Sequence, residues 1–178
     1  MRLNLVLCST MAGSVALPQA HIATVGDGRR ITHLDLGIDW VLGTVPGGNG
    51  MVFVVDLARL LKIAQGMPTT NERASITHLL HLTGSTPVAV ACMGYTPQRE
   101  CLFRPAGSSL RGLPHIVGLA YPEQHPAAPV IHVTQALTTE HRTTLITAIR
   151  HIAEGQSPEG ERGSLMSNDN RDRKEAVA

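Results

Sequence analysis

The chain has 178 residues, of which 43% are hydrophobic and only 3% aromatic, and its formal net charge at pH 7 is +1. This length can bury a sizeable core, which must here be built from valine, leucine, isoleucine and alanine. The near-zero charge and the scattered aromatic residues argue against binding to nucleic acid or to an acidic membrane surface.

The cysteines and the N-terminus bear on the cellular compartment. Cys8, Cys92 and Cys101 form no CxxC pair and no disulfide framework, which favours a reducing compartment. The first twenty residues have one arginine ahead of an apolar stretch, as in a signal peptide, but polar residues interrupt the stretch and Pro18 disfavours cleavage after Ala20. No long uninterrupted apolar run occurs, so we predict no spanning helix and a cytoplasmic location.

The N-terminal half alternates short apolar runs with turns. We predict a strand at residues 3–10 and a second segment, bent at Pro18, at 15–25. A hairpin-type turn at 26–28 follows, and then a half-buried strand or loop at 29–38. Two further strands, 39–45 and 51–57, flank the turn Pro46–Gly50. After Asp56 the spacing becomes helical and ends near Gly66.

In the middle of the chain we predict a loop at 68–76 and a short amphipathic helical piece at 74–84. A buried strand at 85–93 follows, and then a turn-rich segment at 94–112 around a short strand, 101–103. A helix is predicted from Thr139 to Ala153, capped by Thr138 or Thr139, with a stripe of Leu145, Ile146, Ile149 and Ile152. Residues 1–155 are therefore predicted as the folded domain and 156–178 as a disordered tail.

An internal repeat is the main organising feature of the sequence. When Gly43 is aligned with Gly118, Asp56 falls on His132 and Leu61 on Leu137. Two strand pairs rich in valine and leucine could resemble each other by chance. The alternative is that two small, similar β units are joined face to face.

The glycine-rich turn and Asp56 are the first candidates for chemistry. The turn lacks the lysine and hydroxyl of a phosphate-binding loop and precedes a strand, so we interpret it as a tight connection. Asp56 could be a general base, but a carboxylate between a strand and a helix also caps the helix.

Histidines offer a second route to chemistry. His78 and His81 lie three residues apart, a spacing that on a helix could hold one metal ion, although no third ligand is indicated. A small metal-dependent hydrolase using Asp56 with His78, His81 or His132 is therefore an alternative hypothesis. No serine lies in a nucleophile elbow. Of the three cysteines, Cys101 has the neighbours that most favour reactivity, Arg99 and Arg104. We predict no catalytic constellation, no cofactor and no metal site.

The order of these motifs resembles the CheW-like domain family. Leu17 and Pro18 lie in "VALPQAHIATV", which matches the family's "yalP" segment. "VLGTVPGGNGMVFVVDLARLL" matches the family's "vlG" and "vvPVvDLrrLL", with Gly43 and Asp56 thirteen residues apart as in the family. Gly118 and Leu137 anchor a match to the closing segment. The resemblance covers roughly residues 3 to 152.

The resemblance implies a mainly β fold of two small five-stranded barrels packed together, with short helices after Asp56 and at the C-terminal end. It also implies an adaptor without an active site, which couples chemoreceptor cytoplasmic tips to the regulatory domain of a histidine kinase. The implied partner-binding residues are Val45, Pro46, Gly47, Gly48, Asn49 and Gly50. The implied structural residues are Leu17, Pro18, Gly43, Asp56, Leu57, Leu61 and Gly118.

The sequence departs from the family at three places. The arginine that the family uses for partner contact falls on Gly48. The aspartate that the family has after the strand matching residues 102–104 is missing, and the family's closing aspartate is replaced near His132. These departures leave open a domain of the same fold that has lost kinase coupling and only assembles another complex. A non-standard chemosensory system, such as one for twitching, is also compatible with them.

Overall fold

The computed structural model describes residues 1–11, 13–48, 50–107 and 115–153, without the side chains of Ile149, His151 and Ala153. Within this part the chain forms strands β1 to β11, helices α1 to α4 and the short 3-10 helices η1 (Gln19–His21) and η2 (Gly28–Arg30). The tail predicted at 156–178 lies outside the described residues. None of the helices in these ranges combines the length and apolar character needed to cross a membrane.

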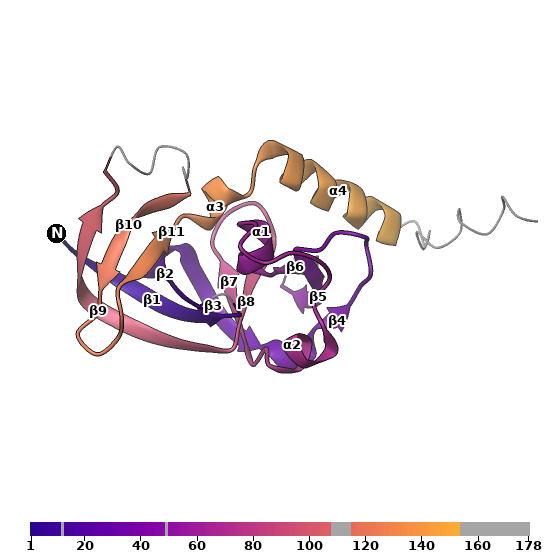
Figure 1. The fold of residues 1–178 in the computed structure, drawn as a ribbon. Helices are drawn as coiled ribbons and strands as arrows, with labels where there is room; N and C mark the ends of the chain where they lie inside the picture. Colours follow the sequence, from indigo (N-terminus) through magenta and orange to yellow (C-terminus); the bar gives the residue numbers. More distant parts are fainter. Residues whose placement is uncertain (12, 49, 108–114, 154–178) are drawn as a thin grey trace, which may run out of the picture.

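The first β unit is a closed five-stranded barrel, seen at the left of Figure 1. Its strands follow the order β1-β2-β11-β10-β9, and their bounds are β1 (Arg2–Thr10), β2 (Gly13–Pro18), β9 (Gly94–Pro105), β10 (Ile116–Tyr121) and β11 (Ala128–Ile131). Leu5, Phe103 and Val130 are among the buried residues that fill it. The barrel is thus built from the two ends of the described chain, with the second unit inserted between β2 and β9.

The second unit is a six-stranded sheet in the order β3-β7-β8-β6-β5-β4. Its strands are β3 (Ile22–Asp27), β4 (Thr32–His33), β5 (Val41–Gly47), β6 (Gly50–Val55), β7 (His78–Leu82) and β8 (Val88–Cys92). The mainly β fold of two packed units is confirmed, but the second unit is not the five-stranded closed barrel that we expected. The sixth strand, β4, can approach β5 because Gly43 has no side chain: a Cβ there would lie 2.1 Å from the Thr32 carbonyl oxygen.

One hydrophobic cluster joins the two units. It takes Cys8 and Leu17 from the barrel, Phe53 and Val90 from the sheet, and Leu145 from α4 (Thr139–Ala153), and all of these are buried. Helices α1 (Leu57–Leu60) and α3 (Val133–Ala136) add their apolar residues to the same cluster. The units therefore share a core.

The two hairpins β5–β6 and β10–β11 repeat one another in detail, which confirms the alignment made from the sequence. The register shifts beside Gly43 in the first and beside Gly118 in the second. The second strand of each hairpin then pairs in parallel with another strand, β6 with β8 and β11 with β2. Asp56 and His132 occupy the same N-cap position before α1 and α3.

Three local predictions were wrong. The segment predicted as helical at 74–84 is mostly not helical, because its residues His78–Leu82 form strand β7, which pairs with β3 on one side and β8 on the other. The loop predicted at 68–76 contains α2 (Thr70–Ala74). The helix after Asp56 is only one turn long, since Lys62 adopts a φ of 58°.

Strand β9 is much longer than the predicted strand at 101–103. Its first half carries Pro97, which lies opposite Val6 of β1. Strand β10 pairs only with Leu102–Pro105, so the other edge of this first half has no ladder partner among the described strands, and a proline is tolerated there. Because of the proline and the neighbouring polar residues, the sequence pattern did not indicate a strand in this first half of β9.

The C-terminal helix α4 is confirmed at Thr139–Ala153. The Thr138 hydroxyl accepts a hydrogen bond from the His141 amide at 3.3 Å, so Thr138 provides the cap. Leu145 is buried as predicted, but Ile146 is 59% exposed and Ala148 is buried instead. The side chain of Ile149 lies outside the described part of the structure.

Candidate partner-binding surface

The predicted partner-binding residues lie at the tip of the β5–β6 hairpin. Pro46, Gly48 and Gly50 are exposed, Gly47 is half-buried, and Asn49 lies outside the described residues. Gly50 has a φ of 125°, a backbone conformation that favours glycine. The tip therefore offers backbone groups, the Pro46 ring and the partly exposed Met51 opposite it, but no charged side chain among its described residues.

Val45 does not belong to the exposed part of this tip. It is 5% exposed and packs in the core of the sheet with Leu42 and Val54. Its side chain supports the hairpin from below and is not available to a partner, because strand alternation directs it to the interior.

The residues predicted to be structural occupy interior or junction positions. Leu17 and Leu57 are each 1% exposed, and Leu61 packs partly buried against the same cluster. Pro18 ends β2 opposite Leu5. A Cβ at Gly118 would lie 2.3 Å from the Arg104 carbonyl oxygen, so this glycine permits close approach of β9 and β10.

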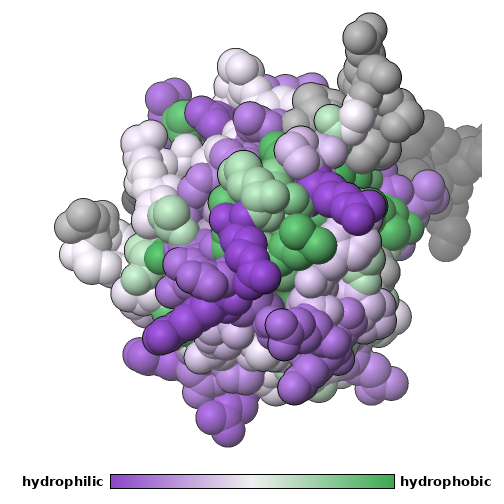
Figure 2. Space-filling view, turned by 90° about the vertical axis from the view of Figure 1, so that its left-hand side faces the viewer, coloured by the Kyte–Doolittle hydropathy of each residue, from purple (hydrophilic) through white to green (hydrophobic). Residues whose placement is uncertain are grey.

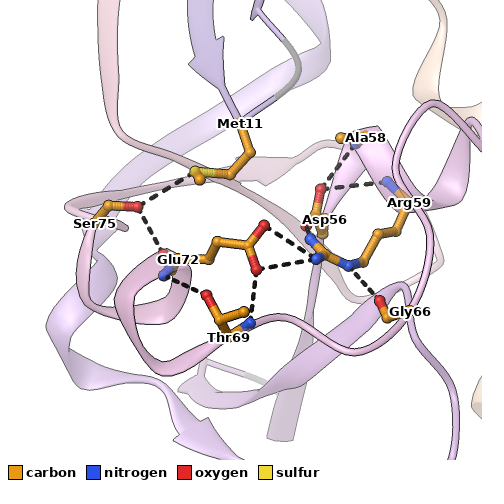
Figure 3. A network of polar contacts seen from close by, with 8 residues as sticks. All are labelled: Met11, Asp56, Ala58, Arg59, Gly66, Thr69, Glu72 and Ser75. Carbon is orange, nitrogen blue, oxygen red and sulfur yellow. Dashed lines mark hydrogen bonds and ion pairs between the residues drawn. The ribbon is translucent and has the colours of Figure 1, made fainter.

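Asp56 is the N-cap of α1 and forms a buried ion pair. Its Oδ1 accepts hydrogen bonds from the amides of Ala58 at 2.8 Å and Arg59 at 3.4 Å. Its Oδ2 contacts the Arg59 guanidinium, and the two residues are 8% and 5% exposed (Figure 3). Of the two readings of Asp56 from sequence, the geometry therefore matches the helix cap.

Arg59 extends this contact into a network that sequence analysis missed. Its Nη2 lies 3.2 Å from both carboxylate oxygens of Glu72, and its Nε donates to the Gly66 carbonyl at 2.7 Å. Glu72 also closes a capping box with Thr69 at the start of α2 (Figure 3). The spacing Thr69-x-x-Glu72 was the available signal for this helix.

The contacts of the network favour the charged forms of Arg59 and Glu72. Burial by itself lowers the pKa of Arg59, but hydrogen bonds and charges from Asp56 and Glu72 outweigh it and raise that pKa above its ordinary value. The Thr69 amide, with help from Arg59, holds the pKa of Glu72 below its ordinary value. Protonation of Glu72 therefore costs more in the folded state. This contribution to stability is fully present above the ordinary glutamate pKa and is lost as the pH falls from there through the lowered pKa of the folded state.

The structure does not bring the histidines to Asp56. The cavity beside Asp56 has a volume of about 20 Å³, room for about one water molecule, and no histidine lines it. No cluster of three metal-ligating side chains occurs within residues 1–11, 13–48, 50–107 and 115–153. The hydrolase alternative has no support in this arrangement.

The histidines themselves occupy separate places. His78 and His81 lie on a strand, where a spacing of three directs side chains to opposite faces. The His78 ring packs edge-to-face on Tyr95 at 5.0 Å between ring centroids, and burial lowers the pKa of His81. His132 packs edge-to-face on His21 at 4.3 Å between centroids; burial, and then the charge of His21, lower its pKa.

The three cysteines are buried and are not joined by a disulfide. A hydrogen bond with Cys92, together with burial, raises the pKa of Cys8. Cys101 faces the barrel interior and its Sγ lies 3.7 Å from the Leu102 carbonyl oxygen. Despite the neighbouring arginines in sequence, Cys101 is placed as a core residue, since thiol reactivity needs exposure and an electropositive setting.

Comparison with known proteins extends these observations. No family model and no curated protein matches the sequence. Among solved structures, the scaffolding protein CheW of Thermoanaerobacter tengcongensis superposes with a TM-score of 0.58 at 13% sequence identity, covering 79% of this chain and 96% of that protein. The likeness shows that the chain has the fold of that scaffolding protein, which confirms the CheW-like fold expected from the sequence.

Proposed function

We propose that the chain is a non-catalytic adaptor of a bacterial chemosensory system, which couples receptors to a histidine kinase through protein–protein contacts in the cytoplasm. The observation that carries the proposal is the fold likeness to a scaffolding protein over nearly the whole of that protein. The placement of Asp56 supports it further, because the aspartate that invited a catalytic reading is buried as a helix cap.

The hairpin tip Pro46–Gly50 is the proposed contact surface toward the kinase regulatory domain or the receptor tips. It projects from a hairpin whose base is fixed by buried residues such as Val45 and Val54. A rigid support with an exposed turn suits recognition, because little order has to be gained on binding.

A second candidate is a domain of this fold that no longer couples to a kinase and only assembles another complex. The observation that favours it is Gly48, which stands where the resemblance places an arginine. Without a cation at this position, the tip cannot donate the charge-assisted hydrogen bonds that make arginine an effective interface residue.

The Gly48→Arg variant separates these candidates in a binding assay with the regulatory domain of a chemosensory histidine kinase. A Cβ at Gly48 meets no atom within 4 Å, so the tip can accept the longer side chain. We expect the natural chain to bind and the variant to bind roughly tenfold more tightly, the gain from one charge-assisted contact.

Gly94→Arg is the matched control, because Gly94 is equally open but lies at the start of β9. Equal affinity of the natural chain and both variants would show that the tip is not the contact surface. Binding by neither the natural chain nor the Gly48 variant, even at high micromolar concentration, would contradict the kinase-coupling role and favour the second candidate.

A further inference from the structure

Two histidines meet where the barrel is joined to the sheet. His21 lies in η1, the short turn through which the chain leaves β2 of the barrel and enters β3 of the sheet. His132 follows β11 of the barrel and stands at the N-cap of α3. The two rings pack edge-to-face with 4.3 Å between their centroids, and both residues are half-buried.

The backbone on each side of this ring contact is anchored to a different unit. The amide of Thr83, directly after β7 of the sheet, donates to the His21 carbonyl at 2.9 Å. The His132 amide donates to the carbonyl of His115, directly before β10 of the barrel, also at 2.9 Å. The ring contact therefore spans the boundary between the two units.

The setting of the pair favours the neutral form of His132. Burial, and then the charge of His21, lower the pKa of His132. Its side chain makes no hydrogen bond to the first turn of α3, in contrast to the carboxylate of Asp56 at the same position of the first hairpin repeat. The ring of His132 is thus placed by its packing against His21 and not by a role as a helix cap.

The titratable side chains on the elements next to the pair are mostly basic. His115 lies beside the end of the β10–β11 ladder, opposite His132. Arg142 of α4 donates from its guanidinium to the Thr134 carbonyl of α3 at 2.9 Å. On the sheet side, β7 carries His81. None of these groups offers a negative charge to an imidazolium.

Carboxylates on the neighbouring elements do not pair with the two histidines. Strongly hydrophilic side chains gather on the outer side of the barrel, which faces the viewer in Figure 2. On β1, which packs against η1, Arg2 pairs with Glu100 of β9 at 3.9 Å, and both side chains are largely exposed. Glu140, at the start of α4, is exposed as well. No carboxylate in the described ranges forms an ion pair with His21 or His132, so a proton gained by the pair is not neutralised.

We propose that the His21–His132 pair is an acid-sensitive joint between the barrel and the sheet. Neutral imidazole rings can pack against each other above the ordinary titration range of histidine. Below it, protonation puts a charge on a half-buried ring, and two like charges face each other once both rings are protonated. The ring contact is then lost, and η1 and the start of α3 separate while the apolar core beneath them remains packed. The inference does not depend on the proposed adaptor function.

The direction of the pH effect follows from the lowered pKa. The unfolded chain binds a proton at His132 near the ordinary value of 6.5, whereas the folded chain binds it only at a lower pH. The stability contributed by the neutral pair is therefore fully present above that ordinary value, and it is lost as the pH falls from there through the lowered pKa of the folded state. Burial also lowers the pKa of His81 and of His115, so the test must isolate the pair.

Urea denaturation of the full chain at about pH 7.5 and at about pH 5 tests the proposal. His132→Phe keeps an aromatic ring against His21 but cannot be protonated. We expect acidification to lower the folding equilibrium constant of the natural chain, and to lower that of His132→Phe by a factor roughly threefold smaller. His21→Phe should have an effect in the same direction. His125→Phe is the control, because His125 is exposed in the turn between β10 and β11, and it should respond to acid like the natural chain.

Amide hydrogen exchange locates the opening. After correction for the intrinsic pH dependence of exchange, the amides of Thr83 and Leu137 should lose more protection in acid than the amide of Phe53, which bonds to the Pro87 carbonyl in the sheet unit. His132→Phe should remove this difference.

Three outcomes would overturn the proposal. The first is an equal pH dependence of the natural chain and of the two phenylalanine variants at His21 and His132, with circular dichroism showing that the variants are folded. The second is a loss of protection no larger at Thr83 than at Phe53. The third is an imidazole resonance of His132 that titrates at or above the ordinary histidine range.

Discussion

Arg59 is a side chain on which several local contacts depend. It joins the cap of α1, the carbonyl of Gly66 and the carboxylate of Glu72, so that three consecutive segments are tied to one guanidinium. Its side chain is 3% exposed. Loss of the guanidinium would leave the carboxylate of Asp56 buried without its counter-charge.

We therefore expect Arg59→Ala to lower the free energy of unfolding by about 3 kcal/mol, the usual cost of removing one partner of a buried ion pair. Chemical denaturation followed by circular dichroism measures it. Arg29→Ala is the control: Arg29 also pairs with an aspartate, Asp27, but its side chain is 83% exposed, so the denaturation midpoint should barely move. Equal effects of the two substitutions would contradict the structural role of Arg59.

The sequence predicts one half of this network and not the other. Asp56 could be assigned as a cap because its place between an apolar strand and a helical stripe is a local pattern. Glu72 lies thirteen residues beyond Arg59, and the path of the intervening chain is not encoded in any local spacing. The capping box of Glu72 with Thr69 was readable, but its link to Arg59 was not.

At the scale of the hairpin, both bulge glycines let a neighbouring strand approach closely, and Gly43 has a second reason to be glycine. Gly43 has a φ of 151°, and a Cβ there would also collide with the backbone of β4. Gly118 has no such φ, but a Cβ would lie 2.4 Å from the Phe103 ring. The sequence repeat identified both positions, and the structure supplies the reason for each.

Gly43→Ala and Gly118→Ala should each lower the free energy of unfolding by about 2 kcal/mol or more, because backbone must move to admit the methyl group. Thermal unfolding followed by circular dichroism gives the size of each loss. Gly48→Ala adds the same methyl group in open space and should have little effect. A Gly43→Ala chain as stable as the Gly48→Ala chain would show that β4 can separate from β5 at no cost.

Helix α4 offers a second comparison at the scale of one element. Leu145→Ala empties a buried position in the shared core and should cost about 3 kcal/mol. Ile146→Ala, one residue further along, should change stability by less than about 0.5 kcal/mol because its side chain faces solvent. Urea denaturation of the two variants side by side decides whether α4 is docked as described; similar losses would mean that it is not.

Other elements show where local patterns stop being informative. The sequence of β7 contains two histidines and three leucines without β-branched residues, and only its two neighbouring strands make it extended. The stripe predicted for α4 included Ile146, because helical spacing alone does not fix which side of an amphipathic helix is covered. In both cases tertiary contacts override the local preference.

At the scale of the whole molecule, the barrel and the sheet share one buried core. Residues of the barrel, the sheet and α4 lie in one cluster, so neither unit can expose its inner face alone without losing contacts of the other. The resemblance to a known family gave the order of elements and the pairing of two β units. It did not give the six-stranded form of the second unit, which depends on the two-residue β4 and the space at Gly43.

We expect a single unfolding transition. Trp40, the only tryptophan of the chain, reports on the sheet unit through its fluorescence, and far-ultraviolet circular dichroism reports on all strands. Val130→Ala, a substitution in the barrel core, should move both midpoints equally. Separate midpoints, or a fluorescence midpoint that Val130→Ala leaves unchanged, would show that the units unfold independently.

The insertion of β3 to β8 between β2 and β9 has a consequence for how the protein is made. On the ribosome, β1 and β2 emerge first but must wait until residues 94–131 have been synthesised before β9, β10 and β11 can close the barrel around them. The strands of the inserted sheet emerge earlier and find all their neighbours before that point. Newly made chains therefore pass through a stage in which the sheet can assemble while the first hairpin is still unprotected, and translation that stops short of β11 leaves a chain that cannot complete its fold.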